Sequence, residues 1–179
     1  MNSINFLKEA KEIENEILRN RRYLHQNAEV GFELPKTTEY VKARLEELGC
    51  EVTACGKNGL IALIGKEGGK TFLLRADMDA LPIKEEADID FACDNGNMHA
   101  CGHDFHTAML LGAAKLLKNH ENELNGRVKL MLQPAEEILS GAKNMIENGV
   151  LENPEPDGAS MLHIMAGLPL KTGTIIVAN

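Results

Sequence analysis

Residues 98–106 concentrate the side chains of this sequence that are best suited to chemistry. This short segment holds a thiol, three imidazoles and a carboxylate: Cys101, His99, His103, His106 and Asp104. A thiolate and an imidazole are typical zinc ligands. Cys101 and His103 are separated by one glycine, so in an extended segment both side chains point the same way and can bind one ion. The spacing matches no common structural zinc motif, so any further ligands must come from elsewhere in the chain.

A second set of polar residues stands where strands are predicted to end, namely Asp77 and Asp79, Glu136 and Glu137, and His163. In open α/β sheets, ligand sites are built at the carboxyl ends of strands. Neighbouring side chains at a strand end point to opposite sides, so one glutamate of the pair can bind a metal while the other carries protons. This division of roles suits metal-assisted hydrolysis, in which a metal lowers the pKa of bound water.

Most of these polar residues also have an ordinary structural interpretation. Paired glutamates are usually solvated, an isolated histidine in an apolar strand is usually a hydrogen-bonded core residue, and an Asp-x-Asp pair is usually a turn. Asp104 is predicted to be a helix cap and nothing more, and His25 a cap at the end of the first helix. His99 and His106 are interpreted as supporting or local residues, and His120 as an exposed residue at a helix end.

Alternating helices and strands are predicted to position these residues. The predicted helices cover 4–27, 36–48, 105–119 and 140–148, and the predicted strands cover 51–55, 60–64, 71–76, 127–132, 158–163 and 173–178. The helix at 105–119 is rich in small residues, which indicates close packing against a sheet. Alternation with several buried strands predicts an α/β fold, a three-layer sandwich around a mostly parallel sheet.

The composition narrows the class of partner. With 179 residues, a formal net charge of −8 and a sequence pI near 5.3, the chain is an acidic globular protein. Nucleic acids and anionic membrane surfaces require clustered positive charge, so we expect a small-molecule substrate instead. The N-terminus is charged early and no later apolar run has the length of a membrane span, so a cytoplasmic protein is predicted.

The four cysteines are predicted to be reduced thiols. Cys50, Cys55 and Cys93 are interpreted as small buried or loop residues. Only Cys101 has neighbours that we expect to lower its thiol pKa and to use its thiolate. Redox chemistry at Cys101 is disfavoured because no resolving cysteine is near in the sequence.

Four motifs, taken in order, resemble the aminoacylase-like metal-dependent amidohydrolases, the group of hippurate hydrolase, the plant auxin-conjugate hydrolases and N-acetyldiaminopimelate deacetylase. They are residues 75–82 (RADMDALP), residues 98–104 (MHACGHD), residues 133–137 (QPAEE) and His163. The resemblance runs from residues 21–25 to residues 173–175, and the motifs are specific because several occur in the right order. It implies a zinc-peptidase-like catalytic domain.

Carried over by position, the resemblance implies a centre of two divalent metal ions. Cys101, His103, Glu137 and His163 are the implied ligands, and Glu136 is the implied general acid/base. Zinc is the metal favoured by this mixture of ligands, with manganese, cobalt and nickel as alternatives.

Two departures from the family pattern concern the surroundings of the centre. Asp77 stands where the peptidase branch usually has histidine, which favours the amidohydrolase branch. Asp79 matches an aspartate that orients a bridging ligand in relatives, and the roles of both aspartates stay open. Ile138 and Leu139 replace a usual glycine-rich stretch.

Family members continue for about as many residues again, through a lid or dimerisation domain and back into the catalytic domain. The resemblance therefore implies that residues 1–179 are the N-terminal portion of the catalytic domain. The resemblance also implies that the lid domain, through which full-length relatives dimerise, and one further histidine ligand lie outside residues 1–179.

The leading hypothesis for function is metal-dependent hydrolysis of the amide bond of N-acyl amino acids. We expect the activity of this chain alone to be impaired, because a metal centre needs its full set of ligands and the exclusion of water. One alternative is a dipeptidase or carboxypeptidase of the same superfamily, which differs in the acyl half of a peptide-like substrate. The other is a non-catalytic metal-binding fragment.

Overall fold

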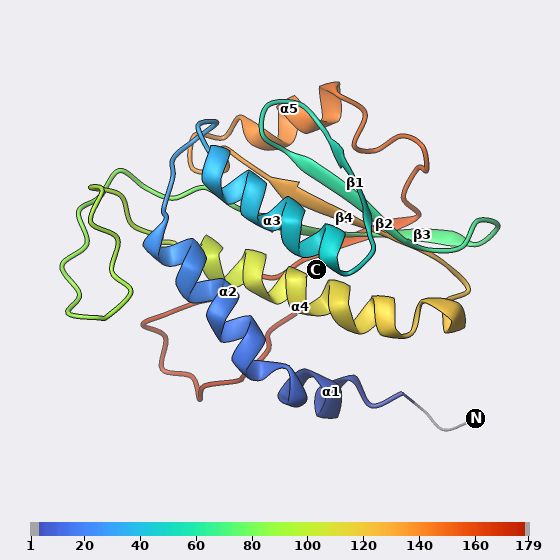
Figure 1. Cartoon of the computed structure of the whole chain (residues 1–179), viewed down its shortest axis with the longest axis horizontal. Coiled ribbons are helices and arrows are strands. Elements are labelled where there is room, and N and C mark those ends of the chain that lie inside the picture. Colours follow the sequence, from blue (N-terminus) through green and yellow to red (C-terminus); the bar gives the residue numbers. More distant parts are fainter. Residues whose placement is uncertain (1–3, 178–179) are drawn as a thin grey trace.

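The computed structural model describes residues 4–177 and consists of helices on both faces of one sheet (Figure 1). In chain order the elements are α1 (Phe6–Glu12), α2 (Glu14–Gln26), α3 (Pro35–Glu47), β1 (Glu51–Ala54), β2 (Leu60–Gly65), β3 (Lys70–Asp77), α4 (His103–Asn119), the 3₁₀ helix η1 (Glu121–Glu123), β4 (Gly126–Gln133), α5 (Gly141–Glu147) and β5 (Gly158–Met161).

The sheet has the strand order β1-β2-β4-β3-β5. Strands β3, β4 and β5 are parallel neighbours, whereas β2 is antiparallel to both β1 and β4. Four of the five strands therefore run in one direction and only β2 opposes them. The prediction of an α/β fold with a mostly parallel sheet is confirmed, and the carboxyl ends of β3, β4 and β5 meet at one edge.

Two apolar layers hold the helices to the sheet. Helices α2, α3 and α4 cover one face and α5 covers the other (Figure 1). Side chains alternate along β4, so Leu130 and Leu132 belong to the first layer while Met131 packs with Met145 of α5 in the second. The three-layer arrangement follows from this alternation, because a strand with apolar residues on both sides must be covered on both sides.

Small residues let α4 lie close to its neighbours. Ala108 and Ala114 are completely buried in the layer between α4 and the sheet. On another side of the helix, a Cβ at Gly112 would lie 2.9 Å from Cδ1 of Ile17. The predicted close packing is therefore present, and Gly112 serves the contact with α2 rather than with the sheet.

Two predicted elements differ in the structure. The helix predicted over 4–27 is divided at Ile13, whose φ of −101° and ψ of 9° leave the helical region and form the cap between α1 and α2. The β-branched run predicted as a strand at 173–178 is irregular over residues 174–177, and residue 178 lies outside the described residues. Ile175, Ile176 and Val177 are exposed. Strand propensity alone does not form a strand without a neighbour to pair with.

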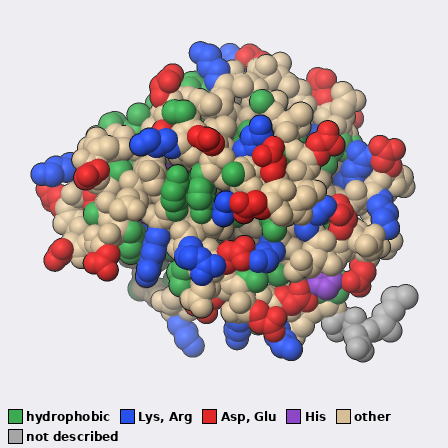
Figure 2. Space-filling model, in the orientation of Figure 1, with side chains coloured by type: hydrophobic (Ala, Val, Ile, Leu, Met, Phe, Trp, Pro, Cys, Tyr) green, Lys and Arg blue, Asp and Glu red, His purple; other side chains and the backbone are tan. Residues whose placement is uncertain are grey.

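Charged side chains of both signs cover the surface (Figure 2). Acidic and basic side chains are interspersed over the face drawn in Figure 2, without a large patch of one sign. Within residues 4–177, no helix combines the length and the apolar character needed to cross a membrane.

Candidate metal centre

The candidate metal ligands meet at the edge of the sheet where β3, β4 and β5 end. Asp77 is the last residue of β3, Glu136 and Glu137 follow β4, and His163 follows β5 by two residues. Helix α4 begins with His103 at the same edge. Parallel strands bring these separate segments together, as expected for sites in open α/β sheets.

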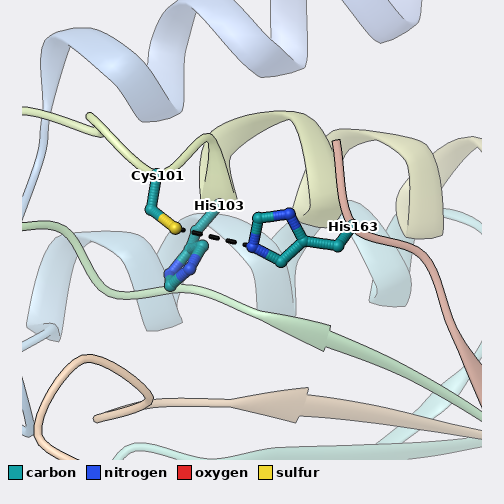
Figure 3. Close-up of side chains that lie close together, drawn as sticks. All are labelled: Cys101, His103 and His163. Atoms are coloured by element: carbon teal, nitrogen blue, oxygen red, sulfur yellow. Dashed lines mark hydrogen bonds between the residues drawn. The ribbon is translucent and has the colours of Figure 1, made fainter. Parts of the chain in front are cut away.

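A left-handed glycine brings Cys101 and His103 together. Gly102 has a φ of 88°, so the segment turns sharply, whereas we predicted an extended segment. A Cβ at Gly102 would lie 2.3 Å from Cδ1 of Ile164, so only glycine fits both the conformation and the space. The turn directs Cys101 toward His163, with 3.5 Å between Sγ and Nε2 (Figure 3).

His103 is held so that one ring nitrogen faces the two glutamates. Its Nδ1 lies 2.8 Å from the backbone oxygen of Asp79, so Nδ1–H donates and Nε2 is left free. Nε2 lies 3.7 Å from Oε1 of Glu137 and 3.8 Å from Oε2 of Glu136. Among the described residues, neither His103 Nε2 nor Glu137 Oε1 has a hydrogen-bond partner, although both atoms are buried.

This pair of unpartnered atoms fits a metal ion. Buried polar atoms are normally satisfied, and an unsatisfied one costs about 1–3 kcal/mol. Zinc binds nitrogen and carboxylate oxygen at about 2.0–2.2 Å, so two ligand atoms 3.7 Å apart can share one ion. The ligand atoms of Cys101, His103 and His163 also lie within 4.8 Å of one another, as do those of His103, Glu136 and Glu137.

The glutamate pair is arranged differently from the prediction. Both carboxylates face His103, whereas we expected the two side chains to point to opposite sides. The cause is a tight turn over residues 136–139, preceded by Ala135 with a φ of 54°, in place of an extended strand end. The two still differ in depth, because the Glu136 side chain is 35% exposed and the Glu137 side chain is 17% exposed.

Asp79 holds this turn against the start of α4. Its two carboxylate oxygens accept the backbone N–H groups of Glu136, at 2.9 Å, and Glu137, at 3.2 Å. Its backbone oxygen accepts from His103, as described above. One fully buried residue therefore fixes the orientation of three side chains at the centre.

Asp77 and His106 lie behind the candidate metal ligands and contact each other. Nδ1 of His106 donates to Oδ1 of Asp77 at 2.6 Å, and Nε2 of His106 accepts the backbone N–H of Ile164 at 3.0 Å. Arg75 lies 2.8 Å from the other Asp77 oxygen. Both nitrogens of His106 are thus engaged, which leaves neither free for a metal and makes His106 a support for the His163 segment.

The carboxylates around the centre shift several pKa values in the metal-free chain. Burial raises the pKa of Glu137, and the charges of Glu136 and Asp79 add to this. Burial lowers the pKa of His103, but its contact with Asp79 and the charge of Asp77 outweigh burial, so that the pKa is raised. The carboxylates around His103 therefore favour its protonated form in the metal-free chain.

Cys101 corrects one sequence-based prediction. Burial and then the charges of Glu137 and Glu136 raise the pKa of its thiol, whereas we expected its neighbours to lower it. The prediction weighed the residues next to Cys101 in the sequence, and the structure adds the charges of Glu137 and Glu136, which follow β4. Cys50, Cys55 and Cys93 are buried free thiols, as predicted.

Asp104 and His25, predicted to be helix caps, and His120, predicted to be exposed at a helix end, have other contacts. Asp104 does not cap α4, whose N-cap is Gly102, but pairs instead with Arg21 and His25. His25 is buried by these contacts and is therefore not a simple helix cap. His120 is partly buried, because it pairs with Glu9 and Glu123.

A family model decides the relationship of this chain to known proteins. Residues 73–178 match the model described as peptidase family M20/M25/M40. The chain belongs to this family. Membership agrees with the expected resemblance and with the α/β architecture of the structure.

The chain is similar to two curated relatives and to one solved structure of this family. The chain is 49% identical over 135 residues to the IAA-amino acid hydrolase ILR1-like 5 of Arabidopsis thaliana, covering 74% of this chain and 31% of the relative. It is 42% identical over 174 residues to the N-acetyl-L-cysteine deacetylase of Bacillus subtilis, covering 93% and 41%. The crystal structure of a Bacillus subtilis protein described as a dinuclear metal binding peptidase from the M20 family matches with a TM-score of 0.83 and 41% identity, covering 89% and 45%.

The chain spans less than half the length of these relatives.

Sequence reasoning selected the residues that meet at the edge of the sheet, but it missed the contacts of Arg21, His25 and Glu85 behind the start of α4. Arg21 and His25 are spaced by four residues on one helix, and this spacing was the available signal.

Proposed function

We propose that this family member carries the metal centre of a hydrolase that cleaves the amide bond of N-acyl amino acids. The observation that carries the proposal is the pair of buried, unpartnered ligand atoms, His103 Nε2 and Glu137 Oε1, at the edge where three parallel strands end. Two relatives are named as an IAA-amino acid hydrolase and an N-acetyl-L-cysteine deacetylase, and these names support the substrate class.

In this proposal, two divalent ions are held by Cys101, His103, Glu137 and His163. A thiolate, two imidazoles and a carboxylate together favour zinc, with manganese, cobalt or nickel as alternatives. When bound, such ions polarise the substrate carbonyl and lower the pKa of water toward neutrality. Asp79 keeps the Nε2 atom of His103 directed at the glutamates by accepting a hydrogen bond from Nδ1.

Glu136 is the proposed general acid/base, because it is the more exposed of the two glutamates and its carboxylate faces the same site. It takes a proton from water as the water oxygen bonds to the acyl carbon. It then gives that proton to the amide nitrogen as the C–N bond breaks. The products are a carboxylic acid and a free amino acid.

Two further parts of the proposal are the domain to which the chain corresponds and its location in the cell. We propose that residues 1–179 correspond to the N-terminal portion of the catalytic domain of longer relatives, a view that the partial coverage of those relatives supports. The free state of Cys50, Cys55, Cys93 and Cys101 supports a cytoplasmic location.

The test is hydrolysis by the purified chain supplied with zinc, cobalt, manganese or nickel. We expect this portion of the catalytic domain to retain reduced turnover, with N-acetyl and N-benzoyl amino acids preferred to dipeptides. Loss of a general acid/base typically costs about 10²–10⁴-fold in rate, so Glu136→Gln should abolish measurable turnover. Glu39→Gln, at an exposed position on α3, is the matched control and should be as active as the wild type.

Three results would contradict the proposal. Full activity in Glu136→Gln would remove Glu136 from the mechanism. Faster hydrolysis of dipeptides would favour the dipeptidase or carboxypeptidase alternative. Bound metal without turnover of any substrate would favour a non-catalytic metal-binding chain.

A further inference from the structure

A buried group of charges lies directly behind the candidate metal centre and has no part in the proposed chemistry. It consists of Arg21 and His25 from α2, Glu85 from the loop of residues 82–97, and Asp104 from the first turn of α4. The side chains of His25, Glu85 and Asp104 are at most 3% exposed. Buried charges of this kind persist only when they are paired and hydrogen-bonded.

His25 lies between the two carboxylates of this group. Its Nδ1 is 2.8 Å from Oδ2 of Asp104, and its Nε2 is 2.9 Å from Oε1 of Glu85. A neutral imidazole has one donor and one acceptor, whereas ionised carboxylate oxygens only accept. A doubly protonated His25 can donate to both carboxylates and, with Arg21, whose Nη2 lies 3.3 Å from the same Nδ1, it would balance the two negative charges.

Neighbouring groups support this charge state. Burial lowers the pKa of His25, but hydrogen bonds with Asp104 and Glu85 outweigh burial and the charge of Arg21, so the pKa is raised. The His99 ring, whose centroid lies 6.3 Å away, is a further titratable group in this region. Burial lowers the pKa of His99 to about 4, so at neutral pH it adds no charge.

Further contacts attach the loop of residues 82–97 to this group. The backbone N–H of Cys93 donates to the second oxygen of Glu85 at 2.9 Å. The guanidinium of Arg21 lies 4.7 Å from the ring centre of Phe91 and 4.4 Å from that of Phe105 in α4. The loop and the start of α4 are thus bound to the same face of α2.

These contacts surround the turn that carries two proposed metal ligands. Asp104 directly follows His103, and the loop of residues 82–97 leads through Met98 to Cys101. We propose that His25 is a positioning residue, which holds the turn of Cys101 and His103 in ligand geometry by joining Asp104 on one side of it to Glu85 on the other. This inference rests on the proposed metal centre.

The test measures binding of cobalt(II) alone to the full chain, by titration and by the absorption spectrum. The thiolate-to-cobalt charge-transfer band reports the bond to Cys101, which a merely stabilising residue would not alter. His120→Gln is the matched control, because His120 also contacts two carboxylates, Glu9 and Glu123, but lies at the opposite end of α4.

We expect His25→Gln to weaken cobalt binding about tenfold and to change the charge-transfer band, because residues that orient metal ligands typically contribute at least tenfold to affinity. His120→Gln should match the wild type in both respects. Far-UV circular dichroism establishes that each variant is folded. An unchanged affinity and band in a folded His25→Gln chain would overturn the proposal, as would weaker binding with an unchanged band.

Two further outcomes keep the test decisive. If His25→Gln does not fold, Glu85→Gln takes its place, and wild-type binding by this variant would overturn the proposal. A wild-type chain that binds no cobalt would overturn the proposed metal centre itself, and the inference about His25 with it. That failure is distinguishable, because it needs no variant to be observed.

Discussion

Replacement of Asp79 by asparagine should destabilise the fold as well as disturb the metal centre. The Asp79 carboxylate is fully buried and accepts the backbone N–H groups of Glu136 and Glu137. Asparagine has nearly the same shape but offers one acceptor oxygen, and its amide nitrogen would face an N–H group. One charge-assisted hydrogen bond, worth about 1.5–3 kcal/mol, is lost, and the other becomes a weaker neutral bond.

Electrostatic effects of the same substitution oppose each other. The charge of Asp79 repels Glu137 and raises the pKa of that carboxyl, but it also stabilises the protonated form of His103. Because these effects act in opposite directions, the loss of hydrogen bonding decides the sign. We expect the free energy of unfolding to fall by about 2–3 kcal/mol, which for a chain of this size lowers the melting temperature by about 5–10 °C.

Urea denaturation of the metal-free chain, followed by far-UV circular dichroism, measures this change. The sequence contains no tryptophan, so intrinsic fluorescence is a poor probe. Asp88→Asn, at an exposed position in the loop, is the control and should match the wild type. A change of less than about 0.5 kcal/mol in Asp79→Asn, the range of ordinary surface substitutions, would refute the role assigned to Asp79.

Three further predictions concern other parts of the chain. Leu139→Gly should raise the free energy of unfolding in urea by about 0.5–1 kcal/mol. Leu139 has a φ of 53°, which glycine adopts without strain, and its side chain is 89% exposed, so little packing is lost. A loss of stability would contradict this. Lys129→Met should lower it by about 2 kcal/mol, because the buried Lys129 ammonium donates to three backbone carbonyls; an unchanged denaturation midpoint would contradict that assignment. Metal affinity, measured by competition with a chelator, should rise with pH through the neutral range. The raised pKa values of Cys101 and His103 keep both side chains protonated at lower pH, and a protonated side chain cannot bind the metal. An affinity that does not change with pH would exclude these ligands.

Local patterns in the sequence were sufficient to locate most elements of the fold. Helix α3 and strands β2, β3 and β4 each lie within one residue of their predicted bounds, because apolar periodicity and flanking glycine or proline residues mark them. The break at Ile13 escaped prediction, since apolar spacing continues through it and no glycine or proline marks it.

The strand order also depends on information that periodicity does not contain. Strand β4 inserts between β2 and β3, and β2 is antiparallel to it. The sequence of each strand shows which of its faces are apolar, but it does not show which other strand it pairs with.

The candidate site was predictable in residue type and less so in geometry. Polar residues are unusual directly after buried strands, and this position identified Glu136, Glu137 and His163 as candidates. The sequence did not show that both glutamates face His103, since this depends on the left-handed conformation of Ala135.

The roles of buried polar residues were the hardest to predict. His25 and Asp104 are separated by 79 positions, and their contact follows from the packing of α2 against α4. Because both residues lie at helix ends, the sequence predicted that they cap those helices. In the structure both side chains are buried and form an ion pair with each other instead.

The metal content of the purified chain tests the central claim most directly. Inductively coupled plasma mass spectrometry should find two divalent ions per wild-type chain after loading and removal of free metal. Cys101→Ser should lose metal, whereas Cys55→Ser, a buried cysteine in the layer between α5 and the sheet, should retain both ions. A wild-type chain without bound metal, or a Cys101→Ser chain with full metal content, would contradict the account.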